Sequence, residues 1–203
     1  KSDVTQVEVK LNSRRFDRYL AAIDTNHIGA GLQALSAKYP DFLNFYLDTL
    51  MGLGIQGNFS DSNPGIQKGM RTFLTYKDYR DLFDTINKHF PDTKELDEQL
   101  ASGFKYAKHY FPAFKEPKVI YITSLLNKYG AFTYGDILGI GLDMFLGASY
   151  PYYKSVGIPE YMAEKLEPGN IPVAAFRAIY EDVMPFQPDN RTLLDMMIQR
   201  GKE

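Results

Sequence analysis

Apolar residues recur along the chain with two different spacings, one typical of strands and one typical of helices. Val7, Val9 and Leu11 alternate with polar residues, which predicts a short strand with one buried face. Apolar positions from 14 to 23 then follow helical spacing, and Ser13 stands where an N-cap is expected. The N-terminal part is therefore predicted to be a strand followed by a helix.

The stretch up to residue 110 shows helical spacing almost throughout. Phe42, Phe45, Tyr46 and Leu50 follow this spacing, and Pro40 stands at the start of their helix. The predicted helices cover residues 27–39, 41–51, 66–74, 78–90 and 91–110. A loop is predicted at 52–65, because this segment is rich in Gly, Asn, Asp and Ser.

The pattern changes to β-rich runs after Pro117. Strands are predicted at residues 119–123, 132–134 and 136–146, the last interrupted by Gly139 and Gly141, which often mark a bulge or a close backbone approach. Helices return at 170–183, with Asn170 as the cap and Pro172 in the first turn, and at 192–199. This order predicts an α+β fold that is mostly helical, with one small sheet packed with helices.

Composition and charge argue against several classes of protein. The 203 residues suit one domain, and we interpret residues 1–203 as a single α+β domain. The formal net charge of −2 argues against a nucleic-acid partner. Cysteine is absent, which excludes disulfides and thiolate metal ligands. No apolar run approaches the ~18 residues that a transmembrane helix needs.

No catalytic site, metal site or cofactor site is predicted. A zinc hydrolase needs two His residues one helical turn apart with Glu beside the first, but His27, His89 and His109 lie far apart and none precedes Glu. A site assembled by the fold from all three is left open. The Gly-x-Ser-x-Gly motif is also absent. Residues 52–57 fit Gly-x-Gly-x-x-Gly by letter, but a helix precedes them, which favours a helix end over a dinucleotide site.

Asp143 is the one acidic residue in an unusual position, because it lies inside the apolar run from 137 to 146. A carboxylate there must be exposed at a sheet edge or hydrogen-bonded. Tyr150, Tyr153 and Tyr161 follow soon after it. One interpretation places Asp143 at solvent on an edge strand, with the tyrosines packing a loop. The other makes Asp143, Tyr150, Tyr153 and Tyr161 a groove for a ligand or partner.

Several motifs resemble the GldB gliding-motility-associated lipoprotein family of Bacteroidota, and the similarity extends over the whole chain. They lie at 140–147 (IGLDMFLG), 150–153 (YPYY), 159–162 (PEYM), 16–17 (FD), 22–25 (AIDT) and 38–43 (KYPDFL). The resemblance implies an exported protein of the cell envelope that faces the periplasm and is lipid-anchored at a Cys upstream of Lys1. It also implies a link to gliding machinery, although many non-gliding bacteria carry such proteins.

The family is also similar to zinc proteases, so the resemblance implies a metalloprotease-like (zincin-like) architecture, here without the metal motif. Members usually continue past the point where this chain stops, and a domain truncated at its C-terminus is expected on that ground. The first hypothesis is a non-catalytic, lipid-anchored envelope module that binds other envelope or motility proteins. The second is a divergent metal-dependent hydrolase in which Asp143, Glu160 or a histidine acts with a metal, an idea that rests on fold analogy alone.

Overall fold

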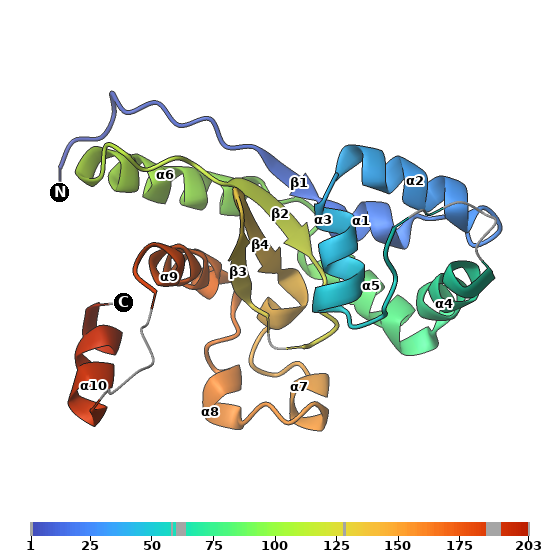
Figure 1. Ribbon diagram of the computed structural model, residues 1–203. Coiled ribbons are helices and arrows are strands. Elements are labelled where there is room, and N and C mark those ends of the chain that lie inside the picture. Colours follow the sequence, from blue (N-terminus) through green and yellow to red (C-terminus); the bar gives the residue numbers. More distant parts are fainter. Residues whose placement is uncertain (1, 58, 60–63, 128, 186–191, 203) are drawn as a thin grey trace.

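A four-stranded mixed sheet lies at the centre of the chain, between two groups of helices (Figure 1). The structure, a computed structural model, describes residues 2–57, 59, 64–127, 129–185 and 192–202. The strand order is β1-β2-β4-β3. The strands β1 (Ser13–Arg15), β2 (Lys118–Ile122) and β4 (Ile137–Gly141) are parallel, and β3 (Ala131–Tyr134) is antiparallel to β4. The predicted α+β class, mostly helical with a small sheet, is confirmed.

Helices occupy most of the remaining chain that the structure describes. Before the sheet they are α1 (Phe16–Ala21), α2 (Ile28–Lys38), α3 (Phe42–Asn44), η1 (Phe45–Leu50), α4 (Pro64–Thr75), α5 (Lys77–His89) and α6 (Lys94–Tyr110). After β4 they are η2 (Leu142–Phe145), α7 (Tyr152–Ser155), α8 (Glu160–Ala163), η3 (Pro168–Asn170), α9 (Ile171–Val183) and α10 (Leu193–Lys202). The predicted helices are confirmed with small shifts at their ends, and the loop predicted at 52–65 falls partly outside the described residues.

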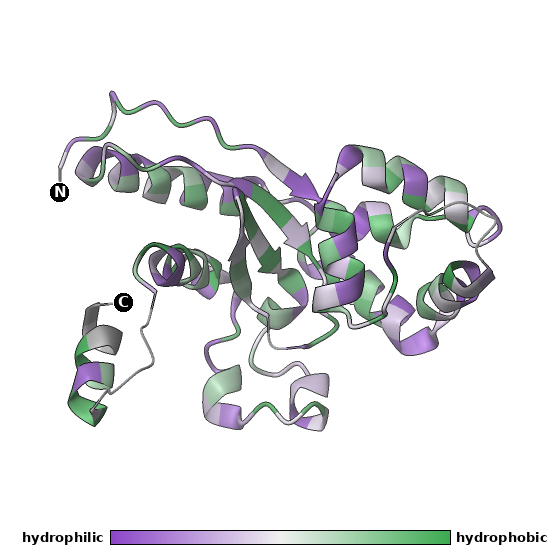
Figure 2. Cartoon of the chain, in the orientation of Figure 1, coloured by the Kyte–Doolittle hydropathy of each residue, from purple (hydrophilic) through white to green (hydrophobic). Residues whose placement is uncertain are grey.

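The sheet separates two apolar cores, because successive side chains of a strand point to opposite faces. On one face, Ile120 and Ile122 pack with the apolar residues of α1 to α4 and η1. On the other, Val119 and Tyr121 pack with those of α6, η2 and α9. Figure 2 shows that the central strands β2 and β4 are mainly apolar, whereas the edge strand β1 is hydrophilic. Burial of each large aliphatic side chain stabilises the fold by about 1.5–3 kcal/mol. The helices on both faces therefore gain stability by packing their apolar side chains against the sheet.

The predictions for the N-terminal part are wrong in detail. The segment 7–11 alternates in burial as expected, but it makes no strand pairing. Pairing begins at Ser13 instead, where the Val119 N–H donates to the Asn12 carbonyl at 2.9 Å. The Ser13 hydroxyl donates to Asp97 on α6 at 2.9 Å, so it ties two segments together rather than capping a helix.

The third predicted strand ends earlier than expected. It runs only from Ile137 to Gly141, and the next four residues form the short helical turn η2. The close approaches that the glycines indicate are present. A Cβ added at Gly139 would lie 2.2 Å from the Phe132 ring, and one added at Gly141 would lie 2.3 Å from the Tyr129 carbonyl oxygen. A side chain at Gly141 would meet a backbone atom, whereas one at Gly139 would require the Phe132 ring to shift.

Candidate functional site

Asp143 lies in the interior of the protein, directly after β4. The interpretation that places it on an exposed edge strand is wrong, because β4 pairs with both β2 and β3 and the Asp143 side chain is fully buried. Its carboxylate accepts hydrogen bonds from the Ser124 N–H at 2.7 Å, the Ser124 hydroxyl at 2.9 Å and the Leu126 N–H at 2.6 Å. The carboxylate is therefore satisfied by the loop that follows β2.

The parallel pairing of β2 and β4 brings this loop and Asp143 together. Carboxyl ends of parallel strands meet at the same sheet edge, so the residues after Ile122 and after Gly141 are neighbours. Leu125 and Leu126 have φ values of 52° and 60°. In this turn the Ser124 and Leu126 N–H groups donate to the carboxylate, whereas the Leu125 N–H donates to the Thr123 hydroxyl. Burial raises the pKa of Asp143 above its ordinary value, and the hydrogen bonds from Ser124 and Leu126 oppose that shift.

Tyr153 links the same cluster to the segment that contains α7 and α8. Its buried hydroxyl donates to the Asp143 carbonyl at 2.9 Å and accepts a hydrogen bond from the Leu146 N–H at 2.9 Å. The Tyr150 ring packs edge-on against the Tyr153 ring, with centroids 5.2 Å apart, and burial raises the pKa of Tyr150 to about 12. The structure thus brings Asp143, Tyr150 and Tyr153 together, with Asp143 and Tyr153 buried and Tyr150 half-buried.

Tyr161 lies apart from that cluster, on the outer surface of α8. Its side chain is 67% exposed, and the neighbouring Tyr152, Val156 and Met162 are exposed as well. These four residues are called the α7–α8 face below. Figure 1 shows both helices below the sheet, projecting away from it. The tyrosine-rich stretch is therefore divided between buried residues that position it and exposed residues that a partner can reach.

Replacement of Tyr153 by phenylalanine is expected to lower the free energy of unfolding by roughly 2 kcal/mol. The change keeps the ring but removes the partner of the buried Leu146 N–H and of the Asp143 carbonyl. Tyr152→Phe is the matched control, because it removes the same hydroxyl from the adjacent, exposed tyrosine. It should leave the free energy of unfolding unchanged. Urea unfolding followed by circular dichroism measures both, and equal midpoints would contradict the role of the Tyr153 hydroxyl.

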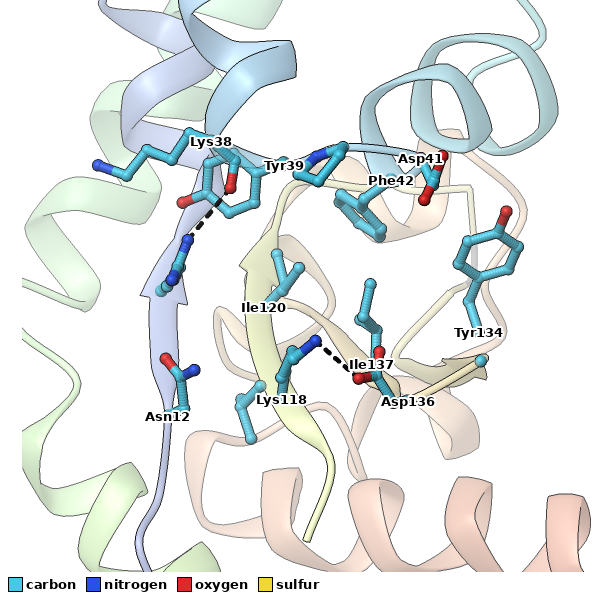
Figure 3. Close-up of a pocket in the computed structure, with 14 residues that line it drawn as sticks. Asn12, Lys38, Tyr39, Asp41, Phe42, Lys118, Ile120, Tyr134, Asp136 and Ile137 are labelled. Carbon is cyan, nitrogen blue, oxygen red and sulfur yellow. Dashed lines mark hydrogen bonds and ion pairs between the residues drawn. The ribbon is translucent and has the colours of Figure 1, made fainter.

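A second feature, which the sequence does not indicate, is a groove of about 610 Å³ on the sheet face that α3 only partly covers. We call it the sheet groove (Figure 3). It lies near the amino ends of β2 and β4, opposite the edge occupied by Asp143. Ile120 and Ile137 form its apolar floor, and Tyr39 and Phe42 border it from the turn between α2 and α3.

Charged residues surround this apolar floor. Lys118 and Asp136 form an ion pair at 2.7 Å. On the β1 side, an Arg14 Nη1–H donates to the Lys38 carbonyl at 3.1 Å. Asp41 lies on the opposite side (Figure 3). No spacing in the sequence connects these positions, because they come from β1, the turn between α2 and α3, β2 and the turn between β3 and β4.

The histidines do not form a metal site within the described residues. His27, His89 and His109 are exposed and stand at or near the ends of α2, α5 and α6. In the part of the chain that the structure describes, no group of three or more His, Cys, Asp or Glu residues is placed to hold a metal ion. The glycines at 52, 54 and 57 follow η1 with positive φ values, as predicted for a helix end.

Comparison with known proteins identifies a family. The family model described as "Gliding motility protein GldB" matches residues 1–203, the whole chain. No curated protein and no solved structure matches the chain. The metalloprotease-like architecture therefore stays a prediction. Among the helices of the described residues, none has both the length and the apolar content required to cross a membrane.

Proposed function

The chain belongs to the GldB family of gliding motility proteins, and from this premise we propose that it is a non-catalytic module that binds another envelope or motility protein. Family membership implies a lipoprotein of the cell envelope associated with gliding motility. In the proposal, residues 1–203 act as one domain that faces the periplasm, and a lipid anchor upstream of Lys1 attaches it to the membrane.

The observation that carries the proposal is the α7–α8 face. Aromatic and methionine side chains are enriched at protein interfaces, and the rigid aromatic rings bury a large area while losing few rotatable bonds. Tyr152, Val156, Tyr161 and Met162 provide such side chains within twelve positions of one another in the chain, on a single segment. A partner protein that covers them would remove apolar surface from water.

Buried residues hold this segment in place. Tyr153 binds the backbone next to Asp143, and Ile158 and Ala163 are buried in the core that includes α9. Because the support is already ordered, binding would cost little conformational entropy. In this proposal Tyr161 contacts the partner, Asp143 and Tyr153 position the segment, and the half-buried Tyr150 connects the two groups.

A pull-down with the full-length, membrane-attached protein tests the proposal. The double variant Tyr152→Ala/Tyr161→Ala is expected to recover at least ten-fold less partner, because aromatic hot spots at interfaces cost about 1–2 kcal/mol or more each when truncated. Tyr110→Ala, which removes an exposed tyrosine from the distant end of α6, is the control and should recover the native amount. The same partner recovery from the double variant as from the native protein would overturn this assignment.

No observation on the described residues favours the divergent hydrolase. Its proposed residues are dispersed: Asp143 is buried against Ser124 and Leu126, whereas Glu160 is exposed on α8. Elemental analysis of the purified protein discriminates the two functions, because stoichiometric zinc held by side chains would favour the hydrolase.

A further inference from the structure

We propose that the sheet groove is a second binding site, which takes a peptide segment carrying an acidic and a basic side chain on either side of apolar residues. The site is separate from the α7–α8 face in the fold: it opens at the amino ends of β2 and β4, whereas the α7–α8 face is positioned from their carboxyl ends.

The floor of the groove provides the apolar contact. The helices α3 and η1 pack on the same sheet face as Ile120 and Ile137, yet Ile137 remains partly exposed. Figure 3 shows both side chains directed into the space between β1 and the turn of the β3–β4 hairpin. The volume of about 610 Å³ lies within the range of ligand sites in proteins. Apolar side chains of a bound segment would therefore displace water from this floor.

The two ends of the groove carry opposite charges that lack partners of opposite sign. Within the described residues, the Arg14 guanidinium donates to a carbonyl and lies 5.8 Å from the Tyr39 ring centroid, but it meets no carboxylate. At the other end, the Asp41 carboxylate is exposed and makes no ion pair with any described residue. Lys118 and Asp136 neutralise each other. Lys38 also lines the groove, but its ammonium lies over an aromatic ring, and Figure 3 shows it directed away from the floor. The charges that remain at the two ends, Arg14 and Asp41, are complementary to a ligand of mixed charge.

This charge arrangement selects against other ligands. A phosphate or a nucleic acid would gain one contact with Arg14 but would be repelled by Asp41. A purely apolar chain would desolvate both charges without replacing their hydration. A peptide that places a carboxylate near Arg14 and an ammonium group near Asp41 satisfies both ends and covers the floor between them.

The walls of the groove are already ordered. The Tyr134 ring stacks on Phe45 of η1 with centroids 3.9 Å apart, and Lys118 is held by Asp136. Asp41 has a φ of 65°, which is unusual for a residue with a side chain and carries an energetic cost. Such backbone strain is concentrated at ligand-binding positions, where the surrounding structure maintains it. A bound segment would meet side chains that need little rearrangement.

The test uses two capped, fluorescently labelled peptides and measures fluorescence anisotropy. The first contains Glu-Leu-Phe-Lys, and the second is the same peptide with Glu replaced by Lys. The native protein is expected to bind the first about five-fold more tightly, which is the effect of one exposed ion pair. Arg14→Glu should reverse this preference, because the charge at that end of the groove is inverted.

Two further variants make the result specific. Arg71→Glu produces the same change of net charge on α4, away from the groove, and should keep the native preference. Asp41→Asn keeps a residue that tolerates positive φ and should weaken binding of the first peptide about five-fold with the fold intact. The proposal is overturned if the native protein shows no saturable binding, or if Arg14→Glu keeps the native order of preference. Neither result would affect the pull-down at the α7–α8 face.

Discussion

Replacement of Asp143 by alanine is expected to lower the free energy of unfolding by roughly 4 kcal/mol. The change removes the shared acceptor of three hydrogen bonds and leaves the Ser124 N–H, the Ser124 hydroxyl and the Leu126 N–H unsatisfied in the interior. Each buried donor without a partner costs about 1–3 kcal/mol. Since domains are stable by only about 5–15 kcal/mol, a large part of the population should unfold under mild denaturing conditions.

Urea unfolding followed by far-ultraviolet circular dichroism measures this loss, since the chain contains no tryptophan to report it by fluorescence. Asp136→Ala is the matched control, because it deletes the same group from an exposed ion pair at the opposite end of β4. Its unfolding midpoint should stay close to the native one. The unfolding midpoint of Asp143→Asn should lie between those of Asp143→Ala and Asp136→Ala, because the amide keeps one acceptor oxygen. If Asp143→Ala and Asp136→Ala lowered the free energy of unfolding by similar amounts, Asp143 would not stabilise the loop after β2.

Gly141→Ala is expected to destabilise the protein by roughly 3 kcal/mol, through overpacking at the end of β4. The added Cβ would lie 2.3 Å from the Tyr129 carbonyl oxygen, and a backbone atom cannot rotate away as a side chain can. The end of β4 is also hydrogen-bonded to the segment that contains Tyr129, because the Gly141 N–H donates to the Gly130 carbonyl at 3.0 Å. The loop after β2 would therefore have to move, and this movement would disturb its hydrogen bonds with Asp143.

Gly169→Ala provides the comparison, since a Cβ there would meet no atom within 4 Å and the residue does not have a positive φ. Its free energy of unfolding should change by no more than about 0.5 kcal/mol. Thermal and urea unfolding of both variants measure the difference. Equal stability of the two would show that the Tyr129 segment adapts to the methyl group, contrary to the expected rigidity of this edge.

The outcome for Asp143 shows how far a local pattern can be interpreted. Its position among apolar residues required either exposure or hydrogen bonding, and that alternative follows from the cost of burying a bare carboxylate. The choice between the two depended on Ser124 and Leu126, which stand far from Asp143 in the sequence and become neighbours only through the β2–β4 pairing. Neither residue carries a motif that identifies it as a partner.

The tyrosines show the same limit on a smaller scale. Tyr152 and Tyr153 are adjacent in the sequence, yet the first is exposed and the second is buried against the Asp143 backbone. Their clustering left two interpretations open, a packed loop or a groove beside Asp143, because the direction of each ring depends on how α7 packs against η2. The sheet groove lay beyond sequence reasoning altogether, because Arg14, Asp41 and Ile137 belong to separate elements.

By itself, the sequence determined the helices, most of the strands, the α+β class and the glycine positions where the backbone approaches closely. The helices and strands depend mainly on interactions between residues a few positions apart, and the apolar spacing records them directly. Only the tertiary structure decided that Asp143 is a buried hydrogen-bond acceptor, that the α7–α8 face is exposed and that a charged groove crosses the sheet. Those features depend on strand order and register, which are set by long-range packing of both apolar cores on one sheet.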